Sequence, residues 1–154
     1  MNQHLASVPV EPPLPKGIHA DLPLPDPELG ALWDSIVLDE HIKQQLLGQA
    51  VLNFTIRRRV PRTVLPLHGV ILLVGPPGTG KTSLARGLAH RVAESFIGKA
   101  FRLIEVEPHS LTSSMLGKSQ RAVTELFSQA VAESAERGPT IVLLDEVETL
   151  AADR

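Results

Sequence analysis

Short apolar runs alternate along this chain with segments in which apolar residues recur at helical spacing. Three runs read as strands, at residues 70–74, 102–108 and 140–146. The first and last are almost entirely apolar, which is typical of strands buried on both faces of a parallel sheet. Because helical segments separate the three runs, the pattern predicts an α/β fold with a parallel sheet flanked by helices.

Three segments carry the helical pattern. The first follows Asp39, a candidate N-cap, and its apolar positions continue to Phe54 before the chain reaches Pro61. The second follows a glycine-rich loop and has apolar residues at positions 84, 85, 88, 92 and 96. The third has them at 122, 123, 126, 127, 130 and 131 and should end at Gly138, because Pro139 follows.

The amino-terminal region has a different composition from the rest. Seven of the 13 prolines precede residue 28, and proline removes backbone donors and favours extended conformations. We therefore expect residues 1–30 to form a proline-rich disordered arm, either a solvated linker or a segment that docks to a partner. Residues 31–154 should form the folded part.

Overall composition excludes some functions. The chain has 154 residues, enough for one domain or part of one, with 43% apolar residues. Its 15 basic and 17 acidic side chains nearly balance, so the net charge gives no electrostatic reason to expect a nucleic acid or an anionic membrane as a partner. Cysteine is absent and no apolar segment is long enough to span a bilayer. We expect a cytoplasmic protein.

The loop between the first strand and the second helix carries the main candidate site. Gly75, Gly80, Lys81 and Thr82 satisfy the spacing G-x-x-x-x-G-K-[ST] in the strand-to-helix context that this motif requires. Backbone N–H groups at a helix amino terminus can surround phosphates, so ATP is the expected ligand. The alternative is a glycine turn with an incidental lysine. The predicted nucleotide-binding residues are Gly75, Pro76, Pro77, Gly78, Thr79, Gly80, Lys81, Thr82 and Ser83.

Two acids complete this site in the sequence. Lys81 should reach the β- and γ-phosphates, and the Thr82 hydroxyl should bind Mg²⁺. Asp145 follows the apolar strand and suits the second protein ligand of that Mg²⁺, while Glu146 suits activation of the attacking water. Glu146 and Lys81 are therefore the predicted catalytic residues, and Thr82 and Asp145 the predicted metal ligands.

These motifs resemble those of a known protein family. "GPPGTGKT" and "IVLLDE" resemble the AAA+ ATPases, and the segments at 32–47, 103–127 and 143–154 resemble the pachytene-checkpoint branch. Members of that branch remodel HORMA-domain proteins. The resemblance implies the large subdomain of an AAA+ P-loop NTPase, assembly into a ring that is typically hexameric, and ATP hydrolysis that drives remodelling of a HORMA-type polypeptide. A nuclear or chromosomal location follows if the source is eukaryotic.

The resemblance also assigns residues outside the phosphate site. It places Ile36 and Val37 beside the adenine, and it places Met115, Leu116 and Gly117 in the pore loop that grips a translocating polypeptide. An aromatic residue is usual in that loop, and methionine is a flexible apolar substitute. Met115 and Leu116 could instead be ordinary core residues of a turn.

The chain departs from the family pattern after Arg154. The strand with the polar sensor, the arginine finger and the helical lid would follow there, so we expect a fold that is incomplete at its carboxyl end. In AAA+ sheets that strand lies between the strands at 70–74 and 141–144, which should therefore have unpaired edges.

Three other functions remain open. The first is a truncated nucleotide-binding module without turnover. The second is a DNA-directed AAA+ ATPase, which the charge balance and the branch resemblance make less attractive. The third is a small-molecule P-loop kinase, whose strands do not ordinarily continue as "DEVETLAADR".

Overall fold

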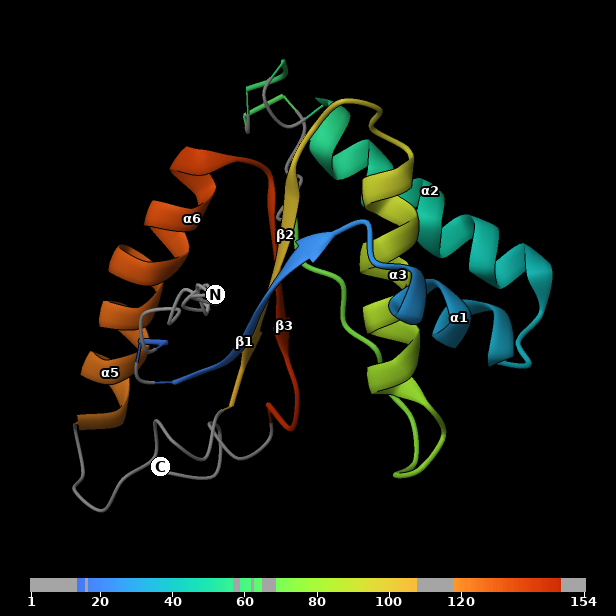
Figure 1. Cartoon of the computed structure of the whole chain (residues 1–154), viewed down its shortest axis with the longest axis horizontal. Coiled ribbons are helices and arrows are strands. Elements are labelled where there is room, and N and C mark those ends of the chain that lie inside the picture. The colour runs from blue at the N-terminus through green and yellow to red at the C-terminus, as the bar shows by residue number, and fades with distance from the viewer. Residues whose placement is uncertain are drawn as a thin grey trace, which may run out of the picture.

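The computed structural model describes residues 14–15, 17–56, 59–61, 63–64, 69–107 and 118–147. A small sheet lies between two helical layers, with α5 and α6 on one side and α1, α2 and α3 on the other (Figure 1). The elements in chain order are β1 Ile18–Leu24, α1 Pro27–Ser35, α2 Glu40–Ile56, α3 Lys81–Glu94, β2 Phe101–Val106, α5 Lys118–Leu126, the π-helical turn η1 Phe127–Val131, α6 Ala132–Arg137 and β3 Thr140–Leu144.

The sheet has the order β1-β2-β3 and is mixed. β2 and β3 are parallel, with Glu105 opposite Leu143. β1 is antiparallel to β2, with Leu22 opposite Leu103. The predicted α/β class and the helices on both faces are confirmed, and the predicted parallel pairing holds for β2 and β3. The strand β1, which the sequence analysis did not predict, adds one antiparallel pairing.

The strand β1 also corrects the expected disordered arm. Within residues 17–30 the structure has β1 and the start of α1, so the arm is wrong there, while residues 1–13 lie outside the described ranges. Proline is tolerated in edge strands, which explains Pro23 in β1. Pro27 opens α1, and the Asp26 side chain caps the helix by accepting the Glu28 N–H at 2.9 Å.

The expected buried strand at 70–74 is wrong in this structure. This segment belongs to no strand, and the residues Val70, Leu72 and Val74 are 73%, 71% and 84% exposed. Ile71 packs against the core from the opposite side of the segment. The physical reason is the lack of a ladder partner: β3 pairs with β2 alone within the described residues, so nothing there bridges β3 and this segment. Of the two unpaired edges expected from the sequence, that of β3 is present within the described residues, whereas residues 70–74 form no strand there.

The helices follow the sequence pattern more closely. Asp39 caps α2, as predicted, by accepting the His41 N–H at 2.8 Å. α3 begins at Lys81 directly after the glycine loop. The third expected helix is continuous from α5 to α6 but includes the π-helical turn η1, which the pattern did not predict.

The sheet separates two apolar clusters. Leu103 and Phe101 of β2 face the side that α1, α2 and α3 cover, while Ile104 and Val106 face the side that α5 and α6 cover. α1 lies directly on α3, because a Cβ at Gly87 would come within 2.7 Å of Trp33. The Lys43 ammonium of α2 donates to the Trp33 carbonyl at 2.8 Å. These contacts fix α3, and therefore the loop in front of it, against the sheet.

Candidate functional site

The glycine loop takes a backbone shape that its glycines permit. Gly78 and Gly80 have φ angles of 76° and 85°, in the left-handed region that costs other residues conformational energy. Gly80 is the N-cap of α3, and its carbonyl accepts the Leu84 N–H at 2.8 Å. The loop therefore ends directly at the amino terminus of a 14-residue helix, where free N–H groups and the helix dipole favour an anion.

Lys81 folds back over this loop. Its Nζ donates to the carbonyls of Gly75 at 3.0 Å and Pro76 at 2.9 Å, and the Thr79 hydroxyl donates to the Pro76 carbonyl at 2.9 Å. These acceptors are neutral and exposed. A phosphate oxygen would offer the ammonium a stronger, charge-assisted bond, so Lys81 is placed to exchange its partners for a phosphate.

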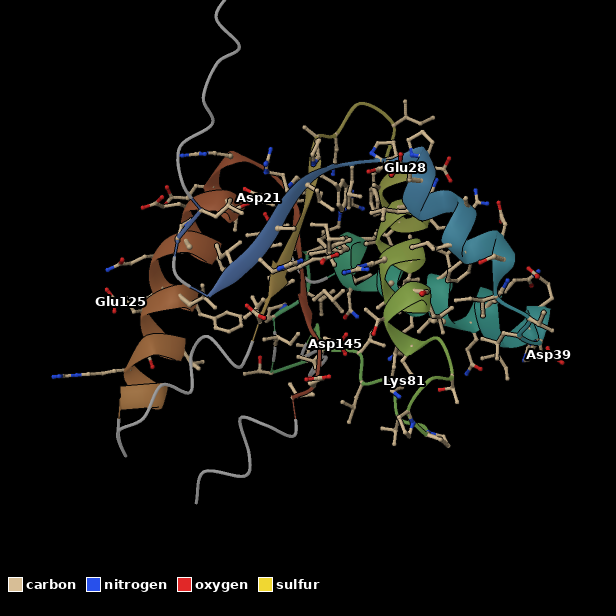
Figure 2. All side chains as sticks on the ribbon, turned by 60° about the horizontal axis from the view of Figure 1, so that its bottom comes forward. Asp21, Glu28, Asp39, Lys81, Glu125 and Asp145 are labelled. Atoms are coloured by element: carbon tan, nitrogen blue, oxygen red, sulfur yellow. The ribbon has the colours of Figure 1, made fainter. Side chains whose placement is uncertain are left out.

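The first turn of α3 meets the end of β3. The Thr82 hydroxyl donates to Asp145 Oδ2 at 2.6 Å, although the two residues are 63 positions apart in the chain. Asp145 Oδ1 accepts the backbone N–H of Glu146 at 3.0 Å, and Glu146 has a positive φ of 49°. Lys81 and Asp145 lie at the same end of the molecule (Figure 2). The structure thus brings together the loop, the Thr82 hydroxyl and the Asp145 carboxylate that the sequence singled out, with the Glu146 backbone directly beside them.

The oxygens of Thr82 and Asp145 form a suitable donor set for Mg²⁺. This ion prefers hard oxygen ligands and is commonly held by one or two protein groups together with phosphate oxygens. Within the described ranges, no group of three or more histidine, cysteine or acidic side chains gathers that could hold a metal on its own. A hydroxyl and a carboxylate that converge beside the candidate phosphate-binding loop fit the shared type of site.

An ion pair beside this site was missed by the sequence analysis. Arg86 Nε and Nη2 donate to Glu105 Oε1 and Oε2, both at 2.7 Å, and the Glu105 side chain is 8% exposed. The hydrogen bonds to Glu105 raise the pKa of Arg86 above its ordinary value, and the charge of Asp145 raises it further. A signal was present in the sequence, because Arg86 lies one helical turn after Thr82.

Only some of the remaining predicted residues lie near the loop. Ser83 lies in the first turn of α3, directly after Thr82. The Ile36 side chain lies beside the loop, 3.8 Å from where a Cβ on Gly80 would be, whereas Val37 is fully exposed. The predicted pore-loop residues Met115, Leu116 and Gly117 lie outside the described residues.

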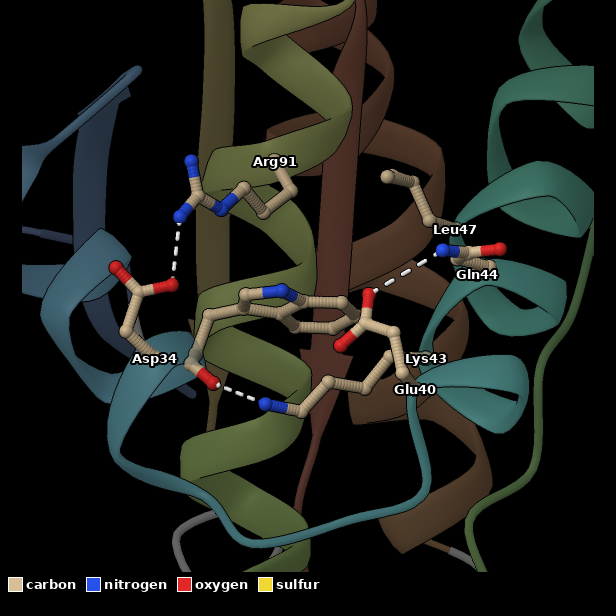
Figure 3. Close-up of a pocket in the computed structure, with 7 residues that line it drawn as sticks. Asp34, Glu40, Lys43, Gln44, Leu47 and Arg91 are labelled. Carbon is tan, nitrogen blue, oxygen red and sulfur yellow. Dashed lines mark hydrogen bonds and ion pairs between the residues drawn. The ribbon is translucent and has the colours of Figure 1, made fainter.

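A separate cavity of about 460 Å³ lies between α1, α2 and α3 (Figure 3). Its lining residues are Trp33, Asp34, Glu40, Lys43, Gln44, Leu47 and Arg91. The polar groups around it are largely bonded to each other: Arg91 pairs with Asp34 at 2.7 Å, and Lys43 donates to a carbonyl. Because it shares no residue with the glycine loop, this cavity is not the candidate phosphate site.

Comparison with known proteins agrees with this geometry. Residues 71–154 match the model of the family described as "ATPase family associated with various cellular activities (AAA)". The chain is 77% identical over 141 residues to CD-NTase-associated protein 6 of Pseudomonas aeruginosa, which covers 92% of the chain and 46% of that protein. It is 40% identical over 137 residues to the pachytene checkpoint protein 2 homolog of Oryza sativa subsp. indica, covering 85% of the chain and 29% of that protein.

A solved structure shows the same similarity. The chain superimposes on the structure of C. elegans PCH-2 with a TM-score of 0.70 at 32% identity, covering 90% of this chain and 38% of that one. The chain thus spans less than half the length of these relatives. In the part of the chain that the structure describes, no helix combines the length and apolar character needed to cross a membrane.

Proposed function

Because the chain belongs to the AAA family of ATPases, we propose that it binds ATP with Mg²⁺ at the loop in front of α3 and takes part in ATP hydrolysis that remodels a protein partner. One observation carries the proposal. The Thr82 hydroxyl and the Asp145 carboxylate, which the sequence assigns to one Mg²⁺, are 2.6 Å apart at the end of the molecule where Lys81 lies.

Each residue has a defined task in this proposal. Backbone N–H groups between Gly75 and Ser83 bind the phosphates, with the positive end of the α3 dipole behind them. The Lys81 ammonium leaves its two carbonyl partners and binds the β- and γ-phosphates. Thr82 and Asp145 hold Mg²⁺, which when bound neutralises charge that develops on the phosphates.

Glu146 is assigned the activation of the hydrolytic water. A carboxylate beside the γ-phosphate can accept a proton from the attacking water, and Glu146 directly follows the metal ligand Asp145. The Asp145 side chain accepts a hydrogen bond from the Glu146 backbone N–H at 3.0 Å. This bond restrains the backbone from which the Glu146 side chain extends. Lys81 and Glu146 are thus the proposed catalytic residues.

The partner is proposed from the similarity. The chain resembles pachytene checkpoint proteins and a CD-NTase-associated protein, and the family resemblance found in the sequence implies a hexameric ring that acts on a HORMA-type polypeptide. We assign the grip on that polypeptide to Met115, Leu116 and Gly117, and we place the activity in the cytoplasm. Copurification with a HORMA-domain protein that depends on ATP, and is lost in Met115→Ser/Leu116→Ser, would support this assignment.

Nucleotide binding is tested first. In calorimetric titrations, Lys81→Met should weaken Mg-ATP binding at least tenfold, because a charge-assisted contact to two phosphates is lost. Lys99→Met, which removes an exposed lysine outside the loop, is the matched control and should bind as the unchanged protein does. Equal binding by all three proteins, or none by the unchanged protein, would contradict the proposed site.

Turnover is tested separately. Glu146→Gln should bind Mg-ATP with unchanged affinity and release phosphate at least a hundredfold more slowly, because the water loses its base. The alternative, a nucleotide-binding module without turnover, predicts no phosphate release from the unchanged protein either. A DNA-directed ATPase predicts stimulation by DNA that falls steeply with salt.

A further inference from the structure

One charged residue interrupts the apolar face of β2. Phe101 and Leu103 point toward α3 and are 1% and 0% exposed, and Glu105 continues the same alternation while being 6% exposed. A buried carboxylate is costly unless it is paired. Arg86 of α3 pairs with it through two hydrogen bonds of 2.7 Å. Replacing a buried ion pair with apolar residues is often neutral or stabilising, so stability alone does not explain a charged residue on this face.

The explanation lies in the position of Arg86 on α3. Thr82 and Arg86 are four residues apart and therefore project from the same face of the helix. Thr82 bonds Asp145, and Arg86 bonds Glu105. The register pairs Glu105 with Leu143, two residues before Asp145 in the chain. Glu105 thus lies in β2 and Asp145 directly follows the neighbouring strand β3, and the two acids meet adjacent turns of one helix.

The guanidinium therefore has two acids within electrostatic reach. Hydrogen bonds to Glu105 make the largest contribution that raises the pKa of Arg86, and attraction to Asp145 adds to it. The Arg86 side chain is 35% exposed and long, so it could turn toward Asp145 if Glu105 did not bind it. A bidentate salt bridge from Arg86 to Asp145 would occupy the carboxylate oxygens, one of which now accepts the Thr82 hydroxyl. It would also neutralise the negative charge that attracts a cation.

We propose that Glu105 is a positioning residue that holds Arg86 away from Asp145 and so leaves the Asp145 carboxylate available to Thr82 and Mg²⁺. This inference rests on the proposed function, because it concerns the metal of that site. Glu105 acts through Arg86 and does not itself contact the nucleotide or the metal. Both its charge and its reach matter, since Glu105 outcompetes Asp145 only while its carboxylate holds the guanidinium through both hydrogen bonds.

The test is the Mg²⁺ dependence of nucleotide binding, measured with a fluorescent ATP analogue at fixed concentration. Glu105→Gln keeps the size of the side chain but frees the guanidinium, and it should raise the Mg²⁺ concentration for half-maximal binding roughly three- to tenfold, as expected for a partly screened charge. Arg86→Gln removes the competing cation and should not raise it. The double variant Arg86→Gln/Glu105→Gln should return to the Mg²⁺ requirement of the unchanged protein.

This pattern separates positioning from a purely structural role. Each single variant leaves one partly buried charge without its partner, so both should lower the free energy of unfolding. A structural role would therefore change Mg²⁺ dependence in both single variants or in neither. Asp21→Asn is the matched control: it removes the carboxylate partner of Arg102 at 2.7 Å on the β1 side of the same sheet, and the Mg²⁺ requirement should stay unchanged.

The outcomes are distinguishable. If the unchanged protein shows no Mg²⁺-dependent nucleotide binding, the proposed function fails. If it binds and Glu105→Gln has the same Mg²⁺ requirement, or if the double variant does not return to it, the positioning role is overturned. Should Glu105→Gln not fold, Glu105→Asp keeps the charge but shortens its reach, and the same increase, smaller in size, is expected. No increase in that variant would also overturn the proposal.

Discussion

Two glycines of the loop, Gly78 and Gly80, hold positive φ angles, and Gly80 is also the N-cap of α3. Space is not what requires glycine at position 80, because a Cβ there would meet only the Ile36 side chain at an ordinary distance of 3.8 Å. The requirement is conformational. The loop keeps the backbone shape described above, which the proposed phosphate binding requires, only while residue 80 stays in the left-handed region.

Gly80→Ala should therefore weaken nucleotide binding without a steric clash. The left-handed conformation costs an L-residue about 1–2 kcal/mol, which corresponds to a roughly five- to thirtyfold loss of Mg-ATP affinity if the loop relaxes in the free protein. Titration calorimetry measures this directly. Gly98→Ala is the control, because Gly98 has a φ of 77°, has open space around it and lies outside the loop. Equal loss of affinity in both variants would contradict a local effect.

Much of the site was predictable at this scale. The spacing from Gly75 to Thr82 and the acids at 145 and 146 identify themselves by chemistry and by their place after apolar runs. The sequence did place Arg86 one helical turn after Thr82, but it did not identify Glu105 as the partner of Arg86, because an arginine on a helix and a glutamate in a strand are each common. Only the fold reveals that the Arg86 guanidinium bonds the Glu105 carboxylate within electrostatic reach of Asp145.

The packing of α1 on α3 is the element-scale feature that holds the loop in place. Gly87 lets the Trp33 backbone approach α3, and Gly30 does the same for His90, since a Cβ at Gly30 would lie 2.6 Å from His90 Nε2. Both glycines are helical and pay the entropic cost of glycine within a helix. Close contact between the two helices compensates for it.

Gly87→Ala should accordingly destabilise the protein. The added methyl group would overlap the Trp33 backbone, so α1 must shift, at a cost of about 1–3 kcal/mol in the free energy of unfolding. Urea denaturation followed by Trp33 fluorescence measures it, since Trp33 is the only tryptophan and is buried.

Gly48→Ala provides the comparison for that measurement. Gly48 lies in α2 with nothing within 4 Å of an added Cβ, so this change should stabilise the protein by about 0.5–1 kcal/mol through helix propensity alone. If Gly87→Ala also stabilised the protein, the close approach of α1 and α3 would not be the reason for glycine at 87.

Sequence pattern predicted helices better than strands. Asp39 and the apolar spacing after it predicted α2, because a helix is specified by local bonds. The strand β1 was hidden by its prolines, although Ile18, Ala20 and Leu22 alternate with more polar residues as in a half-buried strand. Conversely, residues 70–74 have strand composition but no ladder partner in the described structure. A strand depends on its neighbours, which local sequence does not contain.

At the scale of the whole molecule, the candidate site lies where the start of α3 meets the carboxyl end of β3. α3 supplies Lys81 and Thr82, while Asp145 directly follows β3, which is distant from α3 in sequence. The Thr82 to Asp145 bond is exposed, so within the described structure it contributes little to stability on its own. A ligand that contacts both elements would hold α3 and β3 together, and its binding should therefore be visible in the stability of the molecule.

Mg-ATP should raise the thermal midpoint of unfolding. A ligand at 100 times its dissociation constant adds about 2.7 kcal/mol to the stability of the folded state, and for a chain of this size each kcal/mol raises the midpoint by about 2–4 °C. We expect an increase of roughly 5–11 °C, measured by scanning calorimetry. Addition of EDTA should remove most of it, because Thr82 and Asp145 then lose the cation that links them to the phosphates. Asp145→Asn should show a reduced shift that EDTA changes little, whereas a full, EDTA-sensitive shift in that variant would place the metal elsewhere.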